Sequence, residues 1–184
     1  MQLTPPATLA DAARPNHALR DNHMLKPSLL ALACLLTATP AALAQVPVKP
    51  NPNHEQLLAS SDSKAAANKR LVYDFWREVL EGGHLELADK YLTEGYIQHN
   101  PNVPNGRAGF VGFFGKFSKP RSIEARIKAP VVAMVAEGDL VVVSFVQPTP
   151  DPKDPKQMHS TTWFDMFRIE NGKIAEHWDG ANKE

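Results

Sequence analysis

Hydrophobic positions in the first part of the patterned region recur at helical spacing. Between residues 63 and 81, apolar side chains return to one face every three or four positions, as in an amphipathic helix. A Gly-Gly pair ends this helix, and shorter helical patterns follow over 85–92 and 107–117. The last of these is dense in glycine and phenylalanine, which lets a helix pack closely on a sheet. The pattern therefore predicts three helical segments.

Further along the chain, apolar and polar residues alternate as they do in strands. Residues 93–100 predict one short strand that ends in a proline and a turn-rich stretch. Residues 122–148 predict two long strands around a turn at 137–139, and residues 159–180 predict two more around an Asn-Gly pair. Helices followed by antiparallel strands are typical of an α+β fold.

The turn of the last hairpin decides which of its polar side chains share a face. A two-residue type I′ turn at Asn171 and Gly172 would separate Asp165 from His177 and Asp179, because a shift of one residue turns every side chain to the other face. A three-residue loop with Gly172 in the left-handed position of a bulge would bring all three together. The Asn-Gly sequence favours the first turn. Burial favours the second, because the first would also bury a glutamate, and we predict the bulged turn.

The opposite face of this hairpin is predicted to be both charged and strongly apolar. That much apolar surface is too large for one hairpin to leave in water. We therefore predict a homodimer that forms through the outer face of the sheet. In the bulged register, the outer face carries Phe164, Met166, Arg168, Ile174, Glu176 and Trp178.

Composition narrows the partner to a small molecule. The 184 residues include 20 basic and 20 acidic side chains, with 43% hydrophobic residues, which fits one globular domain with extra segments. A nucleic-acid-binding domain normally shows a basic excess or a basic stripe, and neither is present. We expect no nucleic-acid partner.

The N-terminal region has the layout of a secretory signal peptide. Residues 24–44 combine one lysine, an apolar stretch and a small-residue triplet that ends at Ala44. The apolar stretch is too short for a stable membrane span, although an anchor helix is the alternative. Cys34 lies inside this segment, so the mature chain would have no disulfide and no thiol nucleophile, and lipidation at Cys34 is the weaker interpretation.

These features predict cleavage after Ala44 and a periplasmic or secreted protein. Met24 is then a candidate for the true start. The predicted divisions are 1–23 as a mis-called or extra extension, 24–44 as the signal peptide, 45–63 as a proline-rich flexible linker and 64–184 as the folded domain.

Three segments resemble the SnoaL-like polyketide cyclase family of the NTF2-like superfamily. They are "YIQHNP", "GRAGFVGFF" and "FDMFRIENGKIAEHWD", and the likeness covers about residues 65–182. It implies an α+β cone in which three N-terminal helices pack in a strongly curved antiparallel sheet around an apolar pocket. It also implies an acid/base residue in that pocket and, often, a homodimer. This fold also hosts isomerases, dehydratases, epoxide hydrolases and proteins that only bind ligands, so the resemblance fixes no substrate.

The catalytic candidates are Asp179, His177, Asp165 and His99. The resemblance gives the general acid/base role to the aspartate of the terminal strand, here Asp179. A carboxylate that loses hydration in an apolar cone can both take and return a proton. We expect His177 and Asp165 to orient Asp179 or to hydrogen-bond an enolate oxygen. Strand alternation places either His99 or Asn100 in the pocket; His99 could hold a carbonyl there, or only cap the adjacent loop.

The expected ligand is small and apolar or contains a carbonyl group. Its predicted contacts are Tyr96, Asn100, Phe113, Trp163 and Phe167.

We predict no cofactor and no metal. His99, His177 and one aspartate are a rival facial set for iron or zinc, but their spacing fits no dense ligand motif. The stretch "GRAGFVGFFG" does not match G-x-G-x-x-G, which disfavours a dinucleotide site. The interpretation is cofactor-independent aldol-type cyclisation or isomerisation next to a carbonyl. The alternative is a non-catalytic periplasmic binding module.

Overall fold

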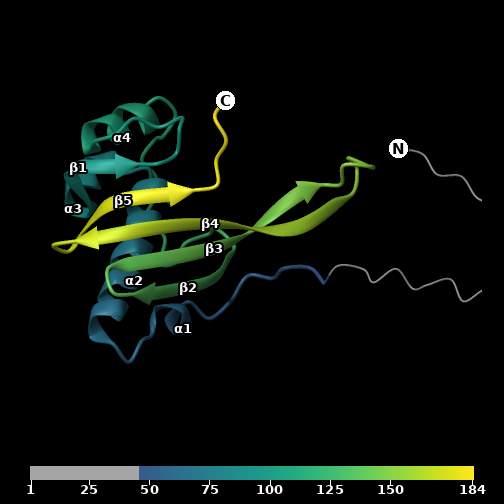
Figure 1. The fold of residues 1–184 in the computed structure, drawn as a ribbon, viewed down its shortest axis with the longest axis horizontal. Helices are drawn as coiled ribbons and strands as arrows, with labels where there is room; N and C mark the ends of the chain where they lie inside the picture. The colour runs from purple at the N-terminus through teal and green to yellow at the C-terminus, as the bar shows by residue number, and fades with distance from the viewer. Residues whose placement is uncertain (1–45) are drawn as a thin grey trace, which may run out of the picture. The chain divides into compact units, whose positions relative to one another are not determined.

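The computed structural model describes residues 46–184, and in this part of the chain the helices precede the long strands (Figure 1). The predicted extension, signal peptide and cleavage site lie outside the described residues. The helices are α1 (His54–Leu58), α2 (Ser63–Phe75), the π-helical turn η1 (Trp76–Glu81), the 3-10 turn η2 (Leu85–Leu87), α3 (Ala88–Tyr91) and α4 (Arg107–Phe114).

Helix α2 begins and continues as its sequence predicts. The Asp62 side chain accepts hydrogen bonds from the backbone N–H groups of Lys64 and Ala65, which satisfies donors that the first turn leaves free. The helix passes without a break into η1, which widens its last turns. Val72 and Val79 on its apolar face are fully buried.

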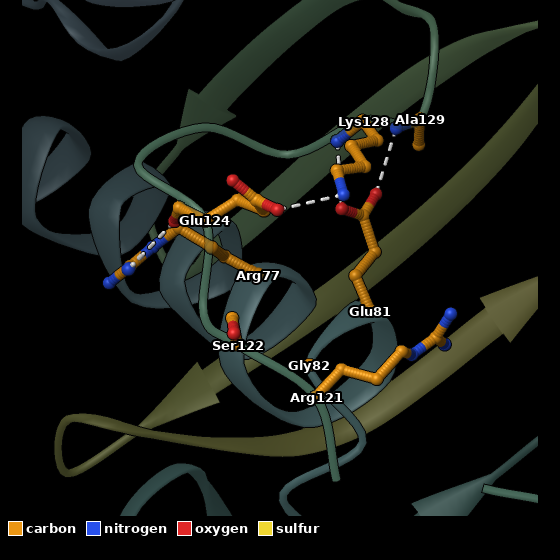
Figure 2. Close-up of a pocket in the computed structure, with 8 residues that line it drawn as sticks. All are labelled: Arg77, Glu81, Gly82, Arg121, Ser122, Glu124, Lys128 and Ala129. Atoms are coloured by element: carbon orange, nitrogen blue, oxygen red, sulfur yellow. Dashed lines mark hydrogen bonds and ion pairs between the residues drawn. The ribbon is translucent and has the colours of Figure 1, made fainter. Parts of the chain in front are cut away.

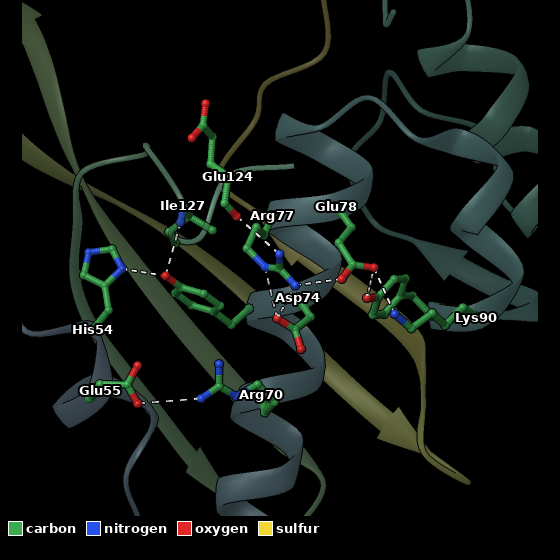
Figure 3. Close-up of polar contacts among 11 residues, drawn as sticks. His54, Glu55, Arg70, Asp74, Arg77, Glu78, Lys90, Glu124 and Ile127 are labelled. Carbon is green, nitrogen blue, oxygen red and sulfur yellow. Dashed lines mark hydrogen bonds and ion pairs between the residues drawn. The ribbon is translucent and has the colours of Figure 1, made fainter. Parts of the chain in front are cut away.

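Part of the predicted linker is folded. Within residues 45–63, helix α1 buries two leucines. His54 Nδ1 lies 2.6 Å from the Tyr73 hydroxyl oxygen (Figure 3). The Lys69 ammonium group donates to the Leu57 carbonyl at 2.8 Å. The prediction of a flexible segment up to residue 63 was therefore wrong, because proline-rich composition does not show the tertiary contacts that fix α1.

Five strands form one sheet in the order β1-β5-β4-β3-β2. The neighbours from β5 to β2 are antiparallel, but β1 pairs parallel with β5. The α+β cone is confirmed with a mixed sheet, and the expectation of a purely antiparallel one is corrected. The chain leaves α3 beside the start of β5, so Leu92 lies opposite Ile174 and Gln98 opposite His177, and the two strands run in the same direction. The strands are β1 (Leu92–Gln98), β2 (Val131–Glu137), β3 (Leu140–Pro150), β4 (Met158–Glu170) and β5 (Lys173–Asp179).

The β4–β5 hairpin has both a two-residue turn and a bulge, which were predicted from the sequence as alternatives. Asn171 and Gly172 both have positive φ, at 50° and 72°, and the strands pair again immediately on either side, as in a two-residue type I′ turn. The register then shifts by one residue at Ala175, which has no partner on β4. Beyond this bulge, Asp165 pairs with Asp179. The two acids therefore share a face, as predicted, but the bulge lies at Ala175 and not in the turn.

The bulge also changes one residue of the outer face. Ile174 is fully buried and belongs to the core cluster, so its placement on the outer face was wrong. The residue pairs with Ile169 before the register shift, and both point inward. The core joins helix side chains such as Val72 and Phe75 to strand side chains such as Val141. Among residues 46–184, no helix has the length and apolar character to cross a membrane.

Candidate functional site

A cavity of about 420 Å³ lies between helices and the inner face of the sheet. Aromatic side chains from η1 and α4 form much of its wall, including Trp76, Phe110 and Phe114. Polar side chains from β4 and β5, including Asp165 and His177, form part of its lining. An apolar hollow with a few converging polar groups is the usual form of a small-molecule site.

Asp165 is the most buried acid of this cavity, with 4% of its surface exposed. Its Oδ1 lies 2.9 Å from His177 Nε2. Its Oδ2 is buried and has no hydrogen-bond partner among the described residues. A buried carboxylate oxygen without a donor is costly. Because this residue also lines the cavity, a bound molecule is in a position to supply the missing donor.

Gln98 determines where His177 carries a proton. The backbone N–H of Asn100 donates to Gln98 Oε1 at 3.1 Å, which identifies that atom as the amide oxygen. His177 Nδ1 lies 2.8 Å from the same oxygen, so Nδ1 must be the protonated nitrogen. A hydrogen bond between Nε2 and Asp165 then requires one further proton. The 2.9 Å contact therefore couples the imidazole of His177 to the carboxyl group of Asp165.

Tyr96 supplies a hydroxyl group at the same end of the cavity. Its oxygen accepts from Gln98 Nε2 at 3.1 Å, so its own hydrogen is not used in that bond. Burial, followed by the nearby carboxylates of Asp179 and Asp165, raises the pKa of Tyr96 far above its ordinary value. The phenol stays protonated and can donate to a ligand oxygen.

Asp179 is held as a carboxylate by two donors. Its Oδ2 accepts from Asn100 Nδ2 at 2.8 Å, and its Oδ1 accepts from the backbone N–H of Ala181 at 2.9 Å. Both Asn100 and Asp179 line the cavity. Of His99 and Asn100, it is therefore Asn100 that faces the cavity.

His99 lies on the other face of the sheet. Its backbone N–H donates to the His177 carbonyl at 2.9 Å, which continues the pairing of β1 with β5 and turns the His99 ring outward. The ring stacks on Trp178 with centroids 4.8 Å apart, and its Nε2 lies 2.9 Å from Glu176 Oε1. The placement of His99 in the pocket was therefore wrong, and His99 leaves the candidate site.

The predicted aromatic contacts divide in two. Tyr96 and Phe167 line the cavity, whereas Phe113 and Trp163 are absent from its lining. The inward face of α4 carries Phe110 and Phe114. Phe113 points to the side, where its ring contacts that of Phe117. Trp163 packs at the end of the sheet with its ring against Gly180.

Gln98 is the functional residue that the sequence interpretation missed. Tyr96, Gln98 and Asn100 alternate along one strand, so all three point to the same face. That alternation was the signal available. Gln98 was overlooked because His99 and Asn100 at the end of the strand were taken as the candidates, and glutamine is common at ordinary surface positions.

Three of the polar groups are close enough to share a cation. One ligand atom from each of Asp165, His177 and Asp179 lies within 4.8 Å of the others. The rival facial set required His99 as a second imidazole, and the structure separates His99 from the other two ligands. The remaining group offers one nitrogen and two carboxylates, with the nitrogen Nε2 already bonded to Asp165.

Comparison with known families agrees with this architecture. The family model for the SnoaL-like domain matches residues 72–177. This chain belongs to the SnoaL-like domain family. The matched range runs from α2 to β5 and includes most of the cavity lining. A comparison with curated proteins gave no match.

Several solved structures are similar to this SnoaL-like chain. TsrD from Streptomyces laurentii is 25% identical, with 65% of this chain and 90% of that one covered and a TM-score of 0.40. A candidate SnoaL-like polyketide cyclase from Jannaschia sp. CCS1 is 16% identical, with coverage of 66% and 91% and a TM-score of 0.44. An LEH-like epoxide hydrolase from M. tuberculosis is 12% identical, with coverage of 63% and 83% and a TM-score of 0.44.

Proposed function

We propose that this SnoaL-like protein transfers a proton at a carbon next to a carbonyl group, without a cofactor, as in aldol-type cyclisation or isomerisation. One observation carries the proposal: Asp165 Oδ2 is buried in an apolar cavity with no donor among the described residues, while Oδ1 bonds to His177. A carboxylate oxygen that faces the cavity without a protein donor is free to accept a proton from a bound molecule.

The step balances with the groups that are present. The C–H bond beside the carbonyl breaks, its proton goes to Asp165 Oδ2, and its electron pair moves to the carbonyl oxygen as an enolate. Tyr96 donates a hydrogen bond to that oxygen, and the His177 side of the pair stabilises the negative charge nearby. Return of the proton to another carbon completes an isomerisation. In a cyclisation, the enolate carbon attacks a second carbonyl, the electron pair of that C=O bond moves to its oxygen, and this oxygen takes the proton from Asp165.

Asp179 receives a different role from the one that its position in the family suggests. Both of its oxygens already accept hydrogen bonds from the protein, whereas Asp165 Oδ2 has no partner among the described residues. We propose that Asp179 and Asn100 position the ligand.

Exchange of carbon-bound protons tests the proposal. A tetralone, an apolar bicyclic ketone, is incubated with the protein in D₂O, and loss of its α-proton signal is followed by NMR. We expect wild type to exceed the buffer rate and Asp165→Asn to return to it. Asp139→Asn removes a carboxylate from an exposed turn and should exchange like wild type. Equal rates in wild type and Asp165→Asn would refute the proposed base.

The second candidate function is ligand binding without turnover. The predominantly aromatic wall of the cavity favours it, since such a wall holds an apolar molecule with no chemistry required. The same experiment separates the two functions. Tetralone that binds, as seen by line broadening, and exchanges only at the buffer rate would identify a binding module.

We also propose export and self-association. Export rests on residues 24–44 and predicts a mature N-terminus at Gln45, which N-terminal sequencing of the protein from the cell envelope would show. A chain that still begins at Met1 or Met24 would contradict it.

Self-association rests on the exposed apolar residues of the outer sheet face, where Phe164 is 57% exposed beside Trp178 and Met166.

A further inference from the structure

Arg121 stands between the cavity and a second, more polar cleft. It lines both the cavity of about 420 Å³ and a neighbouring cleft of about 520 Å³ (Figure 2). The π-helical turn η1 separates the two spaces: Trp76 and Leu80 line the cavity, whereas Arg77 and Glu81 line the cleft. Arg121 is exposed, so it lies at an opening and not in the buried interior.

The other charged groups of the cleft are already paired. The Arg77 guanidinium bonds to Asp74 and to Glu78, at 3.1 Å and 2.7 Å (Figure 3). The Lys128 ammonium lies 2.9 Å from Glu124 (Figure 2).

Glu81 accepts hydrogen bonds from two backbone N–H groups, those of Lys128 and Ala129. No described residue forms a hydrogen bond or an ion pair with the Arg121 guanidinium.

The backbone of Arg121 is fixed although its side chain is free. Its N–H donates to the Gly82 carbonyl at 2.8 Å, and its own carbonyl accepts from His84 Nε2 at 2.7 Å. Gly83 has a φ of +71°, and a Cβ there would stand 2.4 Å from the Lys119 carbonyl oxygen. The glycine thus lets the chain around Arg121 approach η1 closely. A fixed backbone with an unpaired cation is an arrangement suited to an incoming anion.

The cavity lining carries a buried acid and an exposed arginine. Asp165 is buried, and Arg121 is the one arginine or lysine among the described residues that line the space. The rest of the lining includes aromatic side chains such as Trp76 and Phe114. A ligand complementary to this lining has an apolar body, a reactive or donor group for the buried acid and an anion for the exposed arginine.

We propose that Arg121 forms an anion subsite at the mouth of the cavity, and that the substrates are apolar carbonyl compounds with an acidic group remote from the reacting carbonyl. The anion subsite stands on the geometry alone; the carbonyl part of the substrate rests on the function proposed above. A carboxylate or a phosphate on the ligand would supply the same chemistry. Arg121 is a specificity residue here and takes no part in proton transfer.

Two fluorescent probes with one aromatic body test the subsite. Anilinonaphthalene sulfonate carries an anion, and phenylnaphthylamine is the same body without it. We expect Arg121→Gln to weaken binding of the sulfonate by about tenfold and to leave binding of the neutral amine within about twofold of wild type. Arg121→Lys should restore part of the sulfonate affinity. Arg126→Gln removes an exposed arginine of the same segment that does not line the cavity, and should change neither probe.

Two outcomes would overturn the subsite. One is that Arg121→Gln changes both probes equally or neither; the other is that Arg126→Gln weakens the sulfonate as much as Arg121→Gln does. A tetralone with a carboxylate and its methyl ester then separate this inference from the proposed function. Preference for the acid that disappears in Arg121→Gln supports the subsite, whether preference is read from exchange or from binding. Failure of exchange with both compounds refutes the catalytic proposal alone.

Discussion

The inner face of the β4–β5 hairpin holds Asp165 almost fully buried, with one oxygen that has no partner among the described residues. On the outer face, Glu176 accepts from Arg168 Nε at 2.8 Å and meets His99 Nε2 at 2.9 Å. Arg168 also bonds to Glu170 at 3.0 Å. The same two strands therefore carry an incompletely paired acid on one side and a completed ion-pair network on the other.

This contrast distinguishes stabilising charge from reactive charge. A paired network at a half-exposed surface contributes little free energy but fixes strand register. A buried carboxylate with one free oxygen lowers stability, and a protein retains it where its reactivity is used. The free oxygen of Asp165, and not the number of charged residues, is the reason that we propose the inner face as the site of chemistry.

Removal of the inner acid should have the largest effect on activity. We expect Asp165→Asn to lower tetralone proton exchange by about a thousandfold, while Asp179→Asn lowers it by about tenfold because Asp179 positions the ligand and does not take the proton. Thermal unfolding should show Asp165→Asn at least as stable as wild type, since a buried charge is lost. If Asp179→Asn is the more damaging variant, the assignment of the base is reversed.

Disruption of the outer face should change assembly and leave chemistry intact. Phe164→Glu places a charge in the apolar patch, and we expect it to raise the dissociation constant of a homodimer by about a hundredfold. Sedimentation velocity would measure this, with exchange activity per chain unchanged. Ile123→Glu, at an exposed apolar residue outside the sheet, is the matched control. A wild-type protein that sediments as a monomer contradicts the dimer.

The side-chain oxygen of Gln98 lies 2.8 Å from His177 Nδ1 and fixes the tautomer of that ring. In Gln98→Met, the side chain keeps its length and loses its amide, so His177 can move its proton from Nδ1 to Nε2. We expect exchange to fall on the order of tenfold, with a change in the ¹⁵N shifts of the His177 ring that shows the other tautomer. Unchanged ring shifts would show that Gln98 does not set the tautomer.

The smallest effect is expected from the outer network. Hydrogen bonds from Arg168 and then His99 hold the pKa of Glu176 below its ordinary value of 4.5. Because the folded-state pKa is lowered, the stabilisation is present above 4.5 and is lost as pH falls through the lower folded value.

Glu176→Gln should therefore reduce the free energy of unfolding by less than about 1 kcal/mol at neutral pH, and by nothing measurable well below the folded-state pKa. Urea unfolding at the two pH values measures this, with Glu94→Gln as control. A deficit that persists at the acid pH would assign the effect to packing.

Much of the fold could be predicted from periodicity. The long helix, the short strand and four long strands follow from the spacing of apolar residues. The parallel placement of β1 could not be predicted, because it depends on where the chain returns after α3. Helix α1 was hidden by the prolines that precede it, and its contacts with α2 and β2 could not be predicted from composition.

The site was predicted less completely than the fold. Asp165, His177 and Asp179 were brought together by a burial argument, since the other register would have placed Glu176 on the inner face. His99 and Phe113 were placed on the wrong faces because each lies one position from the residue that points inward, and composition alone cannot fix that register. Arg121 lies in an irregular segment whose path no periodicity describes.

The bulge at Ala175 has a consequence for sequence alignment. Ile174 already pairs with Ile169, and Glu176 is the next residue opposite Arg168, so a chain without Ala175 would pair in the same way and keep the same side chains inward. Relatives with a hairpin one residue shorter can therefore retain this chemistry. Counting positions from the Asn-Gly turn would align their functional residues incorrectly, and a gap belongs at Ala175.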